Sequence, residues 1–153
     1  MPSPEERLQE LGLDVPEVAK PVAAYVPALQ TGNLVYTSGQ LPLRNGELIT
    51  TGKVGADVSV EQATDCAQQC ALNALAAVRS LTGELSRVRR VVKVVAYVAS
   101  TPDFTGQPGV ANGASELFGD VFGDAGQHTR SAVGVPVLPL DAPVEVELIV
   151  EVA

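Results

Sequence analysis

The stretch from Val144 to Val152 alternates between apolar and mainly acidic side chains, and this alternation limits the folds open to the chain. Its even-numbered positions are all Val or Leu, whereas the odd-numbered ones are Glu145, Glu147, Ile149 and Glu151. Because successive side chains of a strand point to opposite faces, the pattern predicts a strand with one buried face. The other face must meet solvent or another subunit, and Ile149 among carboxylates favours a subunit contact.

A second strand is expected just before this one. Arg130 opens it, and Val137 and Leu138 lead into Pro139. Proline lacks a backbone N–H group and does not fit inside a central strand, so the turn is placed at Pro139. The segment 128–153 therefore predicts two strands joined by a proline-rich turn.

Two helices are expected upstream. Ser59 followed by Gln62 is a capping-box pattern, which predicts the start of a long helix that ends at Gly83. Its apolar stripe is made mostly of small residues, so the helix should lie close to a sheet. The stripe consists of Ala63, Cys66, Cys70, Ala74, Leu75, Val78 and Leu81. A second helix is expected at 110–122, with its core face formed by Leu117, Phe118, Val121 and Phe122.

The remaining segments complete the predicted order β-β-α-β-α-β-β. They are a short helix at 4–11, an extended linker at 14–22, strands at 25–29 and 34–38, a glycine-rich loop at 39–55 with a turn at 44–47, and a strand at 88–99. We expect a single domain over residues 1–153, of which 1–20 form an N-terminal extension. The predicted fold class is α+β, with a mixed sheet and both helices on one face.

Charge and composition argue against several classes of partner. Ten basic and 18 acidic residues give a net charge of -8, so neither nucleic acid nor an anionic membrane is expected as the main partner. No apolar run is long enough for a transmembrane helix, and the acidic start lacks a signal-peptide core, so a cytoplasmic protein is expected. Cys66 and Cys70 have no His nearby and are expected to be core residues, not zinc ligands.

Arg130 and Glu145 lie on the two C-terminal strands. From their spacing alone we favour an ion pair that braces the hairpin. His128 is the single histidine, and it is either a third group beside Arg130 or, as we favour, an exposed loop residue. Three longer sequence matches change the interpretation of Arg130 and Glu145.

The segment 33–42 reads NLVYTSGQLP and resembles the strand and SGQ(I/L)P signature of the YjgF/YER057c/UK114 family, also called the Rid family of enamine/imine deaminases. Asp103-Phe104, followed by 110–112 (VAN), resembles the family segment that leads into its second helix. Arg130-Ser131, the Leu-Pro turn at 138–139 and VEVE at 144–147 resemble its C-terminal signature. The three matches occur in the order that the family has.

The resemblance implies a chorismate-mutase-like α+β fold of the ferredoxin-like type, and a homotrimer with sites between subunits. Arg130 matches the family residue that holds the substrate carboxylate, and Glu145 matches the acid that positions the attacking water. The positions that match residues lining the pocket are Tyr25, Ser38, Gly39, Asn112 and Ala132. The family often has Cys where Ala132 stands, which indicates a divergent branch.

The activity that the resemblance implies is hydrolysis of reactive 2-enamine or 2-imine acids, such as imines derived from 2-aminoacrylate, to 2-keto acids and ammonia. No metal and no organic cofactor is expected, and the partner is a small imino or keto acid. A second class is left open, namely a trimeric protein that binds small carboxylates and regulates without efficient catalysis. A chorismate-mutase-like isomerase would need several cationic groups, and only Arg130 is clearly placed for that role.

Overall fold

The computed structural model describes residues 2–19 and 24–153, so Lys20 and the end of the predicted linker lie outside the described residues. The helices are α1 (Pro4–Glu10), α2 (Val60–Thr82) and α3 (Gln107–Phe122), with short 3-10 turns at Leu85–Arg87, Gly123–Gly126 and Pro139–Asp141. The strands are β1 (Ala28–Thr31), β2 (Leu34–Thr37), β3 (Leu43–Arg44), β4 (Glu47–Leu48), β5 (Val88–Ala99), β6 (Thr129–Val135) and β7 (Val144–Val152).

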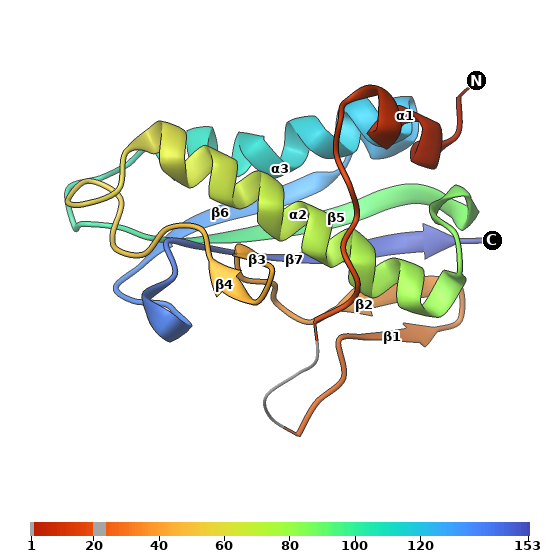
Figure 1. Cartoon of the computed structure of the whole chain (residues 1–153), viewed down its shortest axis with the longest axis horizontal. Helices are drawn as coiled ribbons and strands as arrows, with labels where there is room; N and C mark the ends of the chain where they lie inside the picture. The colour runs from red at the N-terminus through yellow and green to blue at the C-terminus, as the bar shows by residue number, and fades with distance from the viewer. Residues whose placement is uncertain (1, 20–23) are drawn as a thin grey trace.

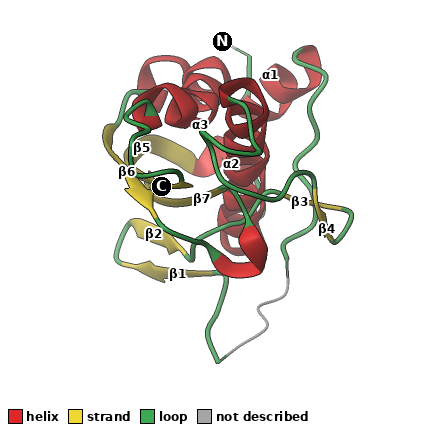
Figure 2. Ribbon diagram, turned by 90° about the vertical axis from the view of Figure 1, so that its left-hand side faces the viewer, coloured by secondary structure: helices red, strands yellow, loops and turns green. Residues whose placement is uncertain are grey.

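The strand β7 lies in the middle of a five-stranded sheet with the order β1-β2-β7-β5-β6. All neighbouring pairs are antiparallel except β5 and β6, which are parallel and are connected through α3. α2 packs on β7 while α3 packs on β5 and β6, and both helices lie on the same side of the sheet (Figure 1, Figure 2). The predicted α+β class, with a mixed sheet and two helices on one face, is confirmed.

The alternation in β7 separates the two faces of the sheet as predicted. The even-numbered side chains of β7 are buried beneath the helices, and the odd-numbered ones are half-buried on the opposite side. Across the β5–β7 pair, Tyr97 lies opposite Glu145 and Lys93 lies opposite Ile149. We call the side of the sheet away from α2 and α3 the open face. Its side chains include Tyr36, Lys93, Val95, Tyr97, Glu145, Glu147 and Ile149.

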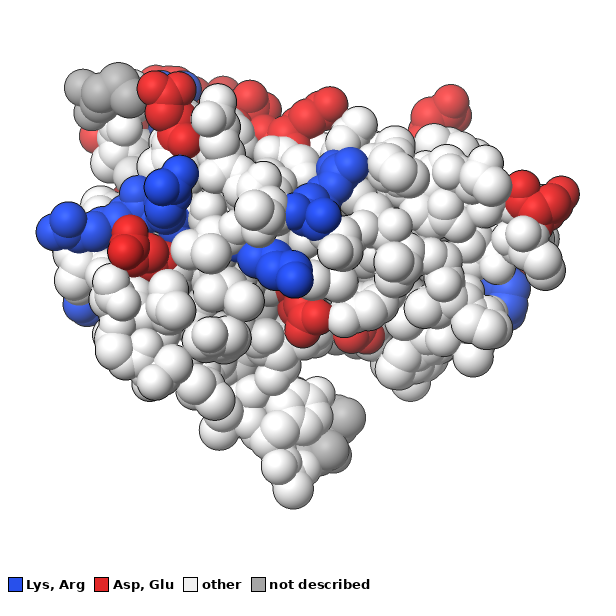
Figure 3. Space-filling model, turned by 180° about the vertical axis from the view of Figure 1, so that it is seen from behind, with Lys and Arg blue, Asp and Glu red and all other residues white. Residues whose placement is uncertain are grey.

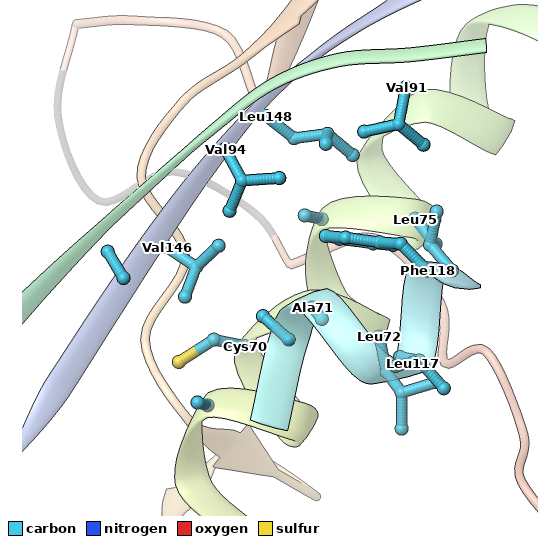
Figure 4. Close-up of a cluster of buried hydrophobic side chains, with 14 of the residues drawn as sticks. Cys70, Ala71, Leu72, Leu75, Val91, Val94, Leu117, Phe118, Val146 and Leu148 are labelled. Carbon is cyan, nitrogen blue, oxygen red and sulfur yellow. The ribbon is translucent and has the colours of Figure 1, made fainter. Parts of the chain in front are cut away.

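The core between the helices and the sheet is built from aliphatic side chains around Phe118 (Figure 4). Phe118, Leu75 and Leu148 are among the largest fully buried side chains. Cys66 and Cys70 are free, buried thiols within this core, as predicted. Leu81 was placed in the same stripe but lies in the last turn of α2 and is 43% exposed.

Local signals set most element boundaries. Ser59 caps α2 through the predicted capping box, in which Ser59 Oγ accepts from Gln62 N at 3.1 Å and Gln62 Oε1 accepts from Ser59 N at 2.9 Å. α3 begins three residues before the predicted start, because Pro108 suits a first helical turn, where an N–H group has no partner. The first strand begins at Ala28, later than the predicted Tyr25.

The glycine-rich loop contains a small hairpin, β3–β4, at the predicted turn. Asn45 and Gly46 have φ of 54° and 82°, which is the left-handed geometry of a two-residue hairpin turn. Asn73 of α2 holds the chain just before the hairpin, since its Nδ2 donates to Leu41 O at 2.9 Å and to Leu43 O at 3.0 Å. The chain that leaves β2 through Gly39 is therefore fixed against α2.

The contact between α2 and α3 depends on one glycine. A Cβ atom at Gly113 would lie far inside van der Waals contact with the backbone oxygen of Thr64. Because a helix backbone cannot move aside cheaply, we expect Gly113→Ala to lower the free energy of unfolding by about 1–3 kcal/mol. Urea unfolding at a fixed protein concentration measures the change.

Gly119 provides the matched control within the same helix. It is exposed, and a Cβ atom there would meet no atom within 4 Å. Gly119→Ala should therefore raise the free energy of unfolding by about 1 kcal/mol, the difference in helix propensity. A Gly113→Ala protein as stable as the wild type would show that the close approach of the helices is not required.

Candidate active site

Arg130 lies near the start of the edge strand β6, on the side that faces α3. It pairs with Val94 of β5, whose side chain is buried beneath the helices, and paired residues point to the same face. Arg130 Nη1 donates to Asn112 Oδ1 at 2.8 Å and to Ser115 Oγ at 3.1 Å. Asn112, a predicted pocket residue, is thus a direct partner of the guanidinium group.

The hydrogen bonds leave one edge of the guanidinium group available. Arg130 is half-buried, and among the described residues its Nε and Nη2 atoms have no hydrogen-bond partner. A guanidinium edge with two N–H groups matches the two oxygens of a carboxylate, in a charge-assisted pair. Ala132 is half-buried on the same face of β6, two residues further along.

Ser115 and His128 extend this group. His128 Nδ1 lies 2.6 Å from Gly126 O, and a carbonyl oxygen only accepts, so Nδ1 carries a proton. In the neutral ring, Nε2 then accepts from Ser115 Oγ at 2.8 Å. A chain of hydrogen bonds therefore runs from Arg130 through Ser115 to His128, which is half-buried rather than an exposed loop residue as favoured from the sequence.

Glu145 lies on the open face of β7, against the backbone of Gly39. A Cβ atom at Gly39 would lie inside van der Waals contact with Glu145 Oε2, so a larger residue at that position would displace the carboxyl group. Burial raises the pKa of the Glu145 carboxyl, and the nearby Glu147 carboxylate raises it further. A carboxyl group with a raised pKa is suited to both accepting and giving a proton nearer neutral pH.

Ser38, between β2 and Gly39, is hydrogen-bonded to the segment that contains Tyr25. Ser38 Oγ donates to Val26 O at 2.6 Å, and Ser38 N donates to Pro27 O at 2.8 Å. These bonds fix the segment before β1, in which the Tyr25 side chain is 51% exposed. Ser38 therefore holds the backbone beside Tyr25, and its hydroxyl hydrogen is already in use.

The predicted residues thus form two separate groups within one chain. Arg130, Asn112 and Ala132 lie on the α3 side. Glu145 lies on the open face against Gly39, and Ser38 ties the chain after β2 to the segment that carries Tyr25. Arg130 does not share the open face with Glu145, because the pairing of β6 with β5 turns Arg130 toward α3. The intrachain ion pair between them is also absent from the described residues, whose one salt bridge joins Lys53 to Asp141.

The open face carries charge of both signs. Figure 3 views the molecule from behind and shows Lys and Arg side chains beside Asp and Glu side chains, among larger areas of other residues.

A cavity of about 170 Å³ on the open face is lined in part by Tyr36, Lys93 and Glu147. A cavity of about 620 Å³ lies at the far end of β6, where Lys53, Phe104 and Gln107 line it. Neither Arg130 nor Glu145 lines either cavity.

No helix in the described part of the chain is both long and apolar enough to cross a membrane. Nor do three or more His, Cys, Asp or Glu side chains gather as metal ligands anywhere in residues 2–19 and 24–153.

Fold and site geometry define an α+β protein of the chorismate-mutase-like type. The family model described as "YjgF/chorismate_mutase-like, putative endoribonuclease" matches residues 5–152. The chain therefore belongs to the YjgF family, as its three sequence motifs indicate.

Two relatives and one solved structure cover nearly the whole chain. Protein TCP17 of Trypanosoma cruzi is 43% identical over 145 residues, which is 94% of this chain and 91% of that protein. The 2-iminobutanoate/2-iminopropanoate deaminase of Dermatophagoides farinae is 34% identical over 140 residues, 90% of this chain and 93% of that protein. The structure of "a putative endoribonuclease from shewanella oneidensis mr-1" superposes with a TM-score of 0.96 at 34% identity, covering 99% of this chain and 100% of that one.

Proposed function

We propose that this protein hydrolyses small 2-imino acids, which form from 2-enamine acids such as 2-aminoacrylate, to 2-keto acids and ammonia. The observation that carries the proposal is the pair of reactive groups. One is a half-buried Arg130 with a free guanidinium edge, and the other is a half-buried Glu145 with a raised pKa. A relative whose name states this reaction supports it.

Arg130 binds the substrate carboxylate and withdraws electron density from the adjacent imine carbon. Such a charge-assisted contact contributes roughly 1.5–3 kcal/mol. Asn112 and Ser115 fix the other side of the guanidinium group, so its free edge keeps one orientation. Ala132 leaves room beside that edge because its side chain is a single methyl group.

Glu145 moves the protons. In its ionised form it takes a proton from water as the water oxygen bonds to the imine carbon, and the C=N π electrons pass to nitrogen. Glu145 gives that proton to the nitrogen, which completes a carbinolamine. It then carries the hydroxyl proton to nitrogen while the C–N bond breaks and the C=O bond forms. Ammonia and the 2-keto acid leave, and Glu145 is again ionised.

We further propose that the two groups meet between copies of the chain in a homotrimer. Within one chain they leave opposite faces of the sheet, so a neighbouring copy would have to supply Arg130 to the Glu145 of the first. Ile149 and Tyr36 on the open face provide apolar area for such a contact, and Tyr36 is 38% exposed. Sedimentation equilibrium should give three times the 15.8 kDa mass of one chain.

RNA cleavage, which the family description mentions, is not the function proposed. Proteins bind the phosphate backbone mainly through Lys and Arg, and this chain has a net charge of -8. The open face places Glu145 and Glu147 side by side, where they would repel a phosphate. A small carboxylate held by one arginine avoids this repulsion.

The proposal predicts turnover by the wild-type protein. When 2-aminoacrylate is generated from serine by a dehydratase, added protein should release ammonia and 2-keto acid faster than buffer alone. Rates equal to those in buffer would exclude the enzymatic function. Binding of pyruvate by calorimetry, without turnover, would instead support the carboxylate-binding regulator.

A further inference from the structure

Tyr97 and Glu147 form a hydrogen-bonded pair beside Glu145. Tyr97 lies directly opposite Glu145 in the β5–β7 pair, and its Oη reaches diagonally to donate to Glu147 Oε1 at 2.5 Å. Aromatic side chains can span such diagonal neighbours on one face of a sheet. The Tyr97 ring therefore runs alongside both carboxyl groups, although the proposed reaction has no use for it.

We propose that Tyr97 and Glu147 are positioning residues that fix a negative charge beside Glu145, and so set the pH at which Glu145 exchanges its proton. This inference rests on the proposed deaminase function for its catalytic meaning. The coupling between the three side chains can be tested without it.

The direction of the effect follows from the chemistry of the pair. Its hydrogen bond to Glu147 raises the pKa of Tyr97 to about 12, so Tyr97 stays protonated and remains a donor near neutral pH. That hydrogen bond also holds the Glu147 carboxyl group in place beside Glu145. A negative Glu147 disfavours a second negative charge on Glu145, so Glu145 holds its proton to higher pH.

The other groups near Glu145 do not supply the same charge. Gly39 presents only backbone. Lys93 precedes Tyr97 by four residues on β5 and lies opposite Ile149 instead of Glu145. Cys70 of α2 lies beneath the sheet, and burial raises its pKa, so it stays a neutral thiol. Among the described residues facing Glu145, Glu147 is therefore the like charge that couples to it.

The experiment is a carboxyl titration of the full chain carrying ¹³C-carboxyl glutamate, followed by NMR. The Glu145 signal is assigned by its absence in Glu145→Gln. We expect Glu147→Gln to move the Glu145 titration to lower pH, and the acid limb of the kcat/KM profile to move with it. Tyr97→Phe removes the hydrogen bond that holds the Glu147 carboxyl group, so it should move the Glu145 titration in the same direction by a smaller amount.

Two variants on the same face are the matched controls. Tyr36→Phe removes a hydroxyl group and Glu151→Gln removes a carboxylate, and both should leave the Glu145 titration unchanged. A Glu145 titration that is identical in wild type and Glu147→Gln overturns the inference even if the enzyme is active. Shifted titrations in a protein without deaminase activity support the pair and refute the proposed function instead.

Discussion

Replacing Glu145 with Gln should lower kcat for imine hydrolysis by roughly 10²–10⁴-fold, the usual contribution of a positioned acid–base group. Gln keeps the size of the side chain and its place against Gly39, but it cannot accept a proton from water. KM should change little, because in the proposed reaction the carboxylate is held by Arg130. Steady-state kinetics of ammonia release measures both constants. Glu151→Gln, on the same strand and face, should keep wild-type kcat.

The same variant has a second expected effect, on stability. The pKa of Glu145 is raised in the fold, so its contribution to stability is present below its unfolded pKa and is lost as pH rises through the folded value. Once Glu145 is ionised, the wild type carries a partly desolvated charge there, whereas the amide of the variant stays neutral. Thermal unfolding should therefore find Glu145→Gln at least as stable as wild type at neutral pH. A kcat loss accompanied by unfolding would contradict the catalytic assignment.

Replacing Arg130 with Ala should lower kcat/KM by about 10- to 150-fold, which corresponds to the roughly 1.5–3 kcal/mol of a charge-assisted carboxylate contact. The loss should appear in both KM and kcat, because the guanidinium group binds the carboxylate and polarises the imine. Calorimetric binding of pyruvate should weaken in parallel.

Two further variants make the Arg130 test specific. Arg130→Lys keeps the charge but loses the planar fork, so it should recover only part of the binding. Arg89→Ala removes an exposed arginine from β5 and should behave as wild type. Full activity of Arg130→Ala would show that the carboxylate is held elsewhere.

The sequence predicted the elements whose side chains repeat regularly. β7 alternates at every position and lies in the centre of the sheet, so burial on one face determined its residues and its orientation. The capping box at Ser59 likewise set the start of α2. In both cases the signal is local, so neighbouring residues were enough to read it.

The face on which Arg130 lies could not be read in this way. β6 reads TRSAVGV, where small residues interrupt any alternation, and its burial pattern is irregular because it is an edge strand. Its orientation comes from the parallel pairing with β5, which is reached through α3. Pairing between segments far apart in the chain leaves no periodic signal in either one.

Ser115 was missed as a partner of Arg130, and His128 was only the less favoured alternative there, for a related reason. Ser115 follows Asn112 by three positions on α3, so the two lie on one helix face, and this spacing was available as a signal. His128 reaches Ser115 only because the turn at Gly123–Gly126 brings the chain back beneath α3. Nothing in the residues next to His128 indicates that return.

The opposite orientations of Arg130 and Glu145 have a genetic consequence under the proposed assembly. Each copy of the chain then contributes half of two different sites instead of the whole of one. When a copy defective at Arg130 associates with a copy defective at Glu145, one interface between them can combine the intact Glu145 of the first with the intact Arg130 of the second. Two inactive alleles produced in the same cell can therefore restore activity that neither provides by itself.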